Sequence, residues 1–284
     1  MFLTFLIKKA EMQKVLRVNS KYKLSGTNSN FVMAFDARDL DWCQSITLLD
    51  AVINRTFPNI YAPINVIALT LIGGSGGVNL SVTIPPLQYT ATTLAAAMQV
   101  AIRAADPGLT GVSVTYLPFP DDRFQFTWDG TGGLMFIYID SDLPSVPNYV
   151  PESTISTYIG MTTNLLLVPS TPISAASQPQ LQGPDEVYIQ SNLIAGPNCV
   201  DVAYLGGFIP YLGKINFAAV PYGFSGTYQS TQAELQQINY KPRFGIQSVR
   251  TFDVQITDRY GNILPIPDNC FVDMHLAFMY EPNQ

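Results

Sequence analysis

The sequence contains one histidine, His275, and three cysteines among its 284 residues. Catalysis by a Ser-His-Asp or Cys-His arrangement would therefore have to use His275. The cysteines, Cys43, Cys199 and Cys270, are odd in number and far apart in sequence, so they indicate neither a disulfide framework nor a zinc site. We expect buried thiols in a protein from a reducing compartment, and we expect no cofactor.

Long apolar runs are also absent. No stretch approaches the roughly 20 apolar residues needed to cross a bilayer. The apolar opening, residues 1–7, precedes its lysines and lacks a small-residue cleavage site, so a secretory signal is not expected.

Charge is scarce: 13% of residues are charged, 47% are hydrophobic, and the net charge is −6. The high hydrophobic content predicts a folded chain. The acidic balance argues against a general nucleic-acid binder, because phosphate contacts need clustered Lys and Arg. Few charges together with many Tyr and Phe suit a protein that buries surface against neighbours.

One basic cluster lies near the N-terminus. Its members are Lys8, Lys9, Lys14, Arg17, Lys21 and Lys23. The cluster is interpreted either as a peptide arm that reaches a partner or as a solvated tail.

Candidate catalytic groups do not form a pattern. We expect His275 to lie opposite the apolar face of its strand and Asp273 to point the other way, so no catalytic pair is predicted and His275 is interpreted as a surface or interface residue. The carboxylates that could pair as a glycosidase acid and base are Asp36, Asp39, Asp41, Asp50, Asp121, Asp122, Asp140 and Asp142. Their spacing selects no two of them, and we predict that the protein is not an enzyme and binds no metal.

Two further motifs have structural interpretations. The glycine-rich residues 73–77 lack the Lys-Ser or Lys-Thr of a phosphate-binding loop and join two predicted strands, so a hairpin turn is expected. Trp42 and Trp128 could stack on sugars, but two scattered tryptophans are more typical of a β core or an interface.

Short apolar segments separated by Gly, Pro, Asn and Asp predict many strands. The expected strands are residues 31–35, 45–53, 64–72, 78–84, 112–116, 123–128, 134–139, 186–193, 214–220, 248–257 and 270–280. One helix is predicted over residues 90–105, where Leu94, Met98 and Ile102 recur at helical spacing after Thr90, a residue type suited to capping. Residues 143–184 are rich in Pro, Ser and Thr and predict a loop, with a short helical turn at 153–159.

These elements predict an all-β protein: an antiparallel jelly-roll sandwich with an inserted small β-rich subdomain that carries one helix. The expected organisation is an N-terminal arm at 1–30, a jelly-roll core from 31–72 and 184–284, and an inserted subdomain with its Pro-rich loop at 73–183.

Three segments resemble the penton and minor capsid jelly-roll proteins of large eukaryotic DNA viruses, virophages and polinton-like elements. The last two strands of those proteins resemble residues 250–266 (RTFDVQITDRYGNILPI) and 271–278 (FVDMHLAF), joined by a hairpin at Asp258, Gly261 and Asn262. Residues 84–90 (IPPLQYT) are similar to the element that precedes the helix of these proteins, with Gln88 where the family has Gly. Residues 183–194 (GPDEVYIQSNLI) are similar to the strand that re-enters the jelly roll.

The resemblance implies a structural virion protein, a capsid vertex (penton) subunit of an icosahedral DNA virus that assembles in the host cytoplasm or nucleus. The implied partners are copies of itself, as a pentamer, and neighbouring capsid proteins, with no nucleic acid bound by the folded body. A minor capsid or cement protein between capsomers, and a carbohydrate-binding β module on the virion surface, are the alternatives.

Overall fold

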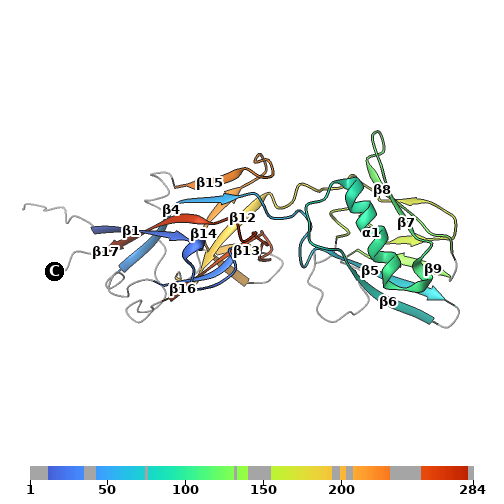
Figure 1. Cartoon of the computed structure of the whole chain (residues 1–284), viewed down its shortest axis with the longest axis horizontal. Helices are drawn as coiled ribbons and strands as arrows, with labels where there is room; N and C mark the ends of the chain where they lie inside the picture. The colour runs from blue at the N-terminus through green and yellow to red at the C-terminus, as the bar shows by residue number, and fades with distance from the viewer. Residues whose placement is uncertain are drawn as a thin grey trace, which may run out of the picture. The chain divides into compact units, whose positions relative to one another are not determined.

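The computed structural model describes residues 12–34, 43–73, 76–130, 133–139, 155–193, 199–202, 207–230 and 251–280. The chain divides into two compact units (Figure 1). Unit 1 combines Met1–Phe57 with Pro184–Gln284, and unit 2 is the continuous stretch Pro58–Gly183. Unit 2 is therefore placed, in sequence, between the two segments of unit 1.

Unit 1 consists of two antiparallel sheets. Its elements are β1 (Met12–Asn19), the 3-10 turn η1 (Ser20–Tyr22), β2 (Ser25–Gly26), β3 (Asn30–Ala34), β4 (Cys43–Asn54), β12 (Glu186–Ser191), β13 (Cys199–Val202), β14 (Gly207–Asn216), β15 (Ser225–Gln229), β16 (Thr251–Thr257) and β17 (Asp273–Tyr280). The first sheet has the strand order β1-β17-β4-β15, and the second has the order β13-β14-β12-β16-β3-β2.

The strand order defines a jelly roll. Without the short β2 and the edge strand β13, eight strands remain, and the first of them pairs with the last (β1 with β17), the second with the seventh (β3 with β16), the third with the sixth (β4 with β15) and the fourth with the fifth (β12 with β14). A chain paired in this way is one long antiparallel hairpin that has rolled into two four-stranded sheets. The predicted all-β, antiparallel jelly roll is confirmed.

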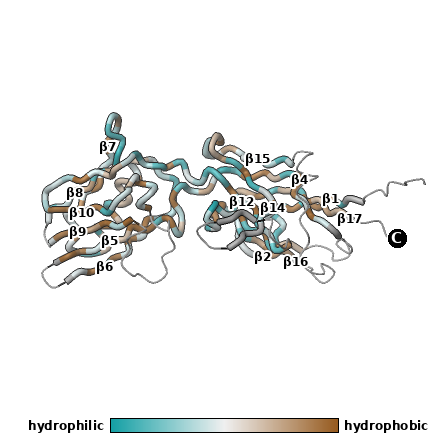
Figure 2. The backbone as a smooth tube through the Cα atoms, turned by 180° about the vertical axis from the view of Figure 1, so that it is seen from behind, coloured by the Kyte–Doolittle hydropathy of each residue, from teal (hydrophilic) through white to brown (hydrophobic). Residues whose placement is uncertain are grey.

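The core of unit 1 lies between the inner faces of the two sheets. Leu48 and Met274 point inward from the first sheet, and Phe31 and Phe252 point inward from the second; all four are buried. The sheets approach so closely at Gly213 that an added Cβ would lie 2.4 Å from a side-chain carbon of Leu48. Figure 2 shows apolar residues alternating with polar ones along the strands, as expected when one face of each sheet is buried.

Unit 2 has two smaller antiparallel sheets and, among the described residues, the one α-helix of the chain. Its elements are β5 (Val66–Gly73), β6 (Gly76–Thr83), α1 (Ala91–Ala105), η3 (Pro107–Leu109), β7 (Ser113–Leu117), β8 (Arg123–Thr127), β9 (Leu134–Ile137), β10 (Leu165–Leu167) and β11 (Ile173–Ser174). The sheet orders are β10-β9-β5-β6 and β11-β8-β7. The expected β5–β6 hairpin is present, with Gly73 opposite Gly76.

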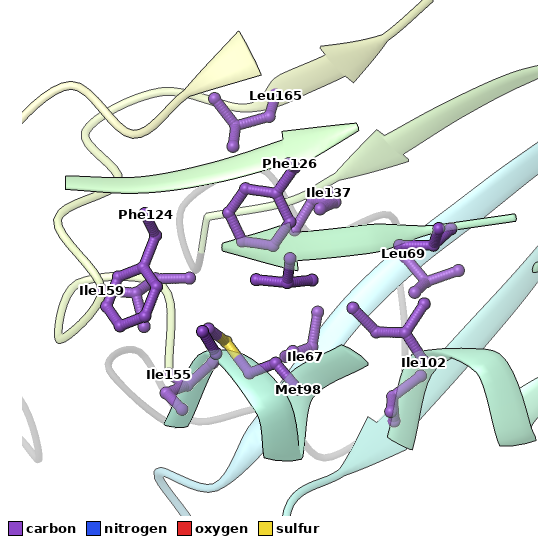
Figure 3. Packing of buried hydrophobic residues seen from close by; sticks show 14 of the residues in the cluster. Ile67, Leu69, Met98, Ile102, Phe124, Phe126, Ile137, Ile155, Ile159 and Leu165 are labelled. Atoms are coloured by element: carbon purple, nitrogen blue, oxygen red, sulfur yellow. The ribbon is translucent and has the colours of Figure 1, made fainter. Parts of the chain in front are cut away.

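The predicted helix and its buried stripe are confirmed. Thr90 caps α1 in a capping box with Thr93, and Met98 and Ile102 are fully buried. They lie in one cluster with side chains from the strands, among them Phe126 (Figure 3). The stripe is therefore the core of unit 2.

The structure differs from the expected organisation in three places. Residues 12–30, expected in an N-terminal arm, include β1, which pairs with β17 along its whole length. The strand expected at 64–72 is β5, and it pairs with β6 and β9 in unit 2. The Pro-rich stretch 143–184 contains β10 and β11, which extend the two sheets of unit 2.

Candidate interaction surface

The single histidine lies on the outer face of the first sheet of unit 1. His275 is half-exposed on β17, and its Nδ1 is 2.8 Å from Oδ1 of Asp50 on the adjacent strand β4. The backbone register places the two residues directly opposite each other. His275 is thus a surface residue beside a carboxylate, in agreement with its predicted interpretation.

The expectation that Asp273 points away from His275 is wrong, because residues two apart along a strand share a face. Asp273 accepts two hydrogen bonds from Arg17 on β1, from Nε at 3.0 Å and from Nη2 at 2.6 Å. This hydrogen bonding, more than the charge of Arg17, lowers the pKa of Asp273. The outer face of the sheet therefore carries a row of charged groups across three neighbouring strands.

The other sequence candidates are dispersed. Trp128 is 1% exposed, which confirms its assignment to a core and contradicts its use as a sugar-stacking platform. Cys270 is a free thiol and partly exposed, so the prediction of a buried thiol is wrong for this residue. The candidates that lie outside the residues with described side chains are Asp36, Asp39, Asp41, Trp42, Cys43, Asp140, Asp142 and Cys199.

Within the described part of the chain, no group of three or more His, Cys, Asp or Glu side chains is arranged to hold a metal ion. No helix among those residues is long and apolar enough to span a membrane.

A polar cluster occupies the outer face of the second sheet of unit 1. Glu186 accepts hydrogen bonds from Nζ of Lys214 at 2.8 Å and from the hydroxyl of Tyr188 at 2.7 Å. The Tyr188 ring packs edge-on against Tyr211, with 5.7 Å between ring centroids. The pKa of Glu186 is lowered mainly by the hydrogen bond from Lys214 and secondarily by that from Tyr188. The pKa of Tyr188 is raised mainly by burial and secondarily by its hydrogen bond to Glu186.

We expect Glu186 to make the stability of unit 1 depend on pH. Because its pKa is lower in the folded state, its contribution is present above the ordinary value of 4.5 and is lost as the pH falls through the lowered pKa. Glu186→Gln should lower the free energy of unfolding by about 0.5 kcal/mol at neutral pH. The effect is small because the side chains of Glu186 and Lys214 are both partly exposed. Denaturant unfolding of both proteins should show the difference shrinking as the pH falls below 4.5. A difference that stays constant with pH would contradict this assignment.

Four described segments that follow or precede strands lie at one end of unit 1, here called the loop end and consisting of residues 20–29, 54–57, 217–224 and 258–272. The registers place the last residue of β1 opposite the first of β17, and the last of β4 opposite the first of β15. Hydrogen bonds join the connections: Asn28 Nδ2 donates to the carbonyls of Pro267 and Cys270 at 2.9 and 2.8 Å. Unit 2 joins unit 1 at this end, after Phe57.

A tight turn is present at Asp258–Asn262 and is built around one carboxylate, but the predicted hairpin between the last two strands is wrong, because β16 and β17 lie in different sheets. Asp258 is buried, and its carboxylate accepts from the backbone N of Tyr260 at 2.8 Å and from the backbone N and Nδ2 of Asn262, each at 2.9 Å. Gly261 takes a φ of +84°, which glycine adopts without strain. The loop end is thus a preorganised surface.

Large apolar side chains are exposed on the loop end. They are Tyr22, Leu24, Tyr222, Phe224, Ile263 and Phe271. Apolar groups gathered on ordered loops are typical of protein interaction sites. This surface was not predicted from the sequence, because its apolar side chains come from three connections that are distant in sequence.

No family model and no curated protein matches the sequence. Among solved structures, the chain is similar to the mavirus penton protein, with 11% sequence identity, coverage of 94% of this chain and 99% of the penton chain, and a TM-score of 0.45. The sequence resemblance names the same class of protein as this solved structure.

Proposed function

We propose that the chain is a structural, non-enzymatic capsid subunit that forms the vertex (penton) of an icosahedral DNA virus. The observation that carries the proposal is the strand order of unit 1: the eight-stranded, double-sheet jelly roll is typical of viral capsid proteins, and also of lectins and cupins. Fold alone does not select among these functions.

The side chains of unit 1 favour the capsid function over the other two. A cupin holds its metal with ligands inside the roll, whereas the sole histidine of this chain lies on an outer face and the described inner faces are lined mainly by apolar residues. Of the two tryptophans that could stack on sugars, Trp128 of unit 2 is buried and offers no such platform. The exposed apolar loop end instead suits contacts with other protein subunits.

A minor capsid or cement role, and glycan binding through the exposed tyrosines of the loop end, are the competing functions. A cement protein would be monomeric in solution and bind only to assembled capsomers. A glycan-binding module would retain oligosaccharides on an array.

The test is the mass of the purified protein by light scattering, followed by electron microscopy of any oligomer. A vertex subunit should form rings with a mass near five times 31.2 kDa. Phe224→Ser at the loop end should shift the equilibrium toward monomer, whereas Val100→Ser, which truncates an equally exposed apolar residue on α1, should not. A protein that stays monomeric at all concentrations contradicts the vertex assignment.

A further inference from the structure

The turn between β7 and β8 presents an aromatic side chain to solvent. This tip, Pro118–Asp122, projects from the rest of unit 2 (Figure 1). Phe119 is 90% exposed, the highest value among the exposed large hydrophobic residues of the described chain. The prolines on both sides of Phe119 are exposed as well.

The tip is ordered by its own hydrogen bonds. The backbone N of Asp121 and that of Asp122 donate to the carbonyl of Pro118, at 3.2 and 3.5 Å. The Tyr116 hydroxyl donates to the Asp122 carboxylate, and the Tyr116 ring packs on Phe124 with 5.7 Å between centroids. The backbone that carries Phe119 is therefore ordered, which lowers the entropy lost when the tip binds.

Unit 2 is acidic in composition. It contains seven Asp or Glu residues and two Arg residues, so it carries −5 of the net charge of −6. At the tip itself, the side chain of Asp121 is exposed. A partner that receives Phe119 should therefore be apolar and bear positive charge.

Unit 1 of the same chain has a surface of that kind, the basic turn Ser20–Leu24. Tyr22 is 71% and Leu24 is 61% exposed, and they alternate with Lys21 and Lys23. The Lys21 amine lies 6.0 Å from the Tyr22 ring centroid, and Lys23 Nζ donates to Oδ1 of Asn28 at 2.8 Å. Residues 1–30 as a whole carry six basic residues and one acidic residue.

We propose that the tip of one copy binds the basic turn of a second copy, with Phe119 packed against Tyr22 and Leu24 and Asp121 facing Lys21. The two surfaces differ, so the contact is head-to-tail and repeats until a ring closes. Tip-to-tip contact would oppose like charges, and an anionic membrane would repel the acidic unit. The inference rests on the self-assembly in the proposed function.

The contact is tested by charge reversal in the full chain. Asp121→Lys and Lys21→Glu change exposed side chains, so both variants should keep the wild-type thermal midpoint. Each should weaken self-association about three- to tenfold in sedimentation equilibrium, more at low salt than at high salt. An equimolar mixture of the two variants should regain most of the wild-type association, because a five-membered ring can alternate the variants at four of its five contacts, and each of these four is again between opposite charges.

The apolar part of the contact is tested by Phe119→Ser. This variant should weaken association at least about tenfold, and Val100→Ser serves as the control for loss of exposed apolar surface. If all variants assemble as strongly as the wild type, the proposed contact is wrong, but the vertex function is not contradicted. A wild-type protein that is monomeric at all concentrations overturns both. Single variants that weaken association without recovery in the mixture also overturn the pairing of tip and basic turn.

Discussion

Replacing Asn59 with leucine is expected to lower the free energy of unfolding by about 3–5 kcal/mol. Asn59 is 1% exposed at the start of unit 2. Its Nδ2 donates to the carbonyls of Tyr89 and Leu181, at 2.8 and 2.7 Å, and its Oδ1 accepts from the Tyr89 N at 2.8 Å. Leucine has a similar volume and satisfies none of these three buried groups.

One amide thus ties three parts of unit 2 together: its first residues, the residue before the helix cap and the last residues before the chain returns to unit 1. Gln88 adds to this connection, because its Oε1 accepts from the Asn59 backbone N at 3.0 Å. Gln88 therefore has a structural role at the start of unit 2.

The measurement for Asn59→Leu is denaturant unfolding combined with hydrogen exchange of the Tyr89 amide. Asn65→Leu is the matched control, since Asn65 is buried in the same unit but its side chain makes one such bond, from Nδ2 to the Ile84 carbonyl at 2.7 Å. Asn65→Leu should lower the free energy of unfolding by about 1–2 kcal/mol. Equal losses in the two variants, or an unchanged Tyr89 amide, would contradict the assigned role of Asn59.

The predictions that succeeded depend on local patterns. Alternation of Leu80 and Val82 with polar neighbours identified β6, and a capping threonine followed by spaced Leu94 and Met98 identified α1. Six of the eight jelly-roll strands overlap an expected strand; the two that do not are β1 and β15.

In β1, charged residues concealed the strand. Lys14 and Arg17 were assigned to a basic arm, whereas β1 is the edge strand of the first sheet. Edge strands commonly carry Lys and Arg, which oppose pairing with other chains. The inward residues Leu16 and Val18 were the available signal, but two positions are too few to establish a period of two.

The strands β10 and β11 and the loop-end surface were missed for different reasons. β10 and β11 are three and two residues long, so no periodicity is measurable in them. The loop end depends on which connections meet in space, and that follows from the pairing of strands far apart in sequence. Residue types alone therefore predicted a protein without a catalytic pattern but not where its contact surface lies.

Replacing Arg55 with methionine is expected to destabilise unit 1 by about 2–4 kcal/mol. Arg55 is 7% exposed directly after β4, where the chain leaves unit 1, and its Nη1 donates to the carbonyls of Phe217, at 2.9 Å, and Val220. Its backbone N donates to the Phe224 carbonyl, and its carbonyl accepts from the Gly223 N, both at 2.8 Å. Methionine keeps the length of the stem but leaves the carbonyls of 217 and 220 without this donor.

The effect should be largest in the connection between β14 and β15, which also carries Phe224 of the loop end. Denaturant unfolding should report the loss, and hydrogen exchange should show reduced protection at Gly223 and Phe224. Arg17→Met is the matched control, because Arg17 makes its ion pair at an exposed position on the same unit, and the thermal midpoint of that variant should stay near the wild-type value. If Arg55→Met unfolds at the wild-type midpoint, the guanidinium does not hold the connection between β14 and β15, and the backbone hydrogen bonds of Arg55 to Gly223 and Phe224 are sufficient to order it.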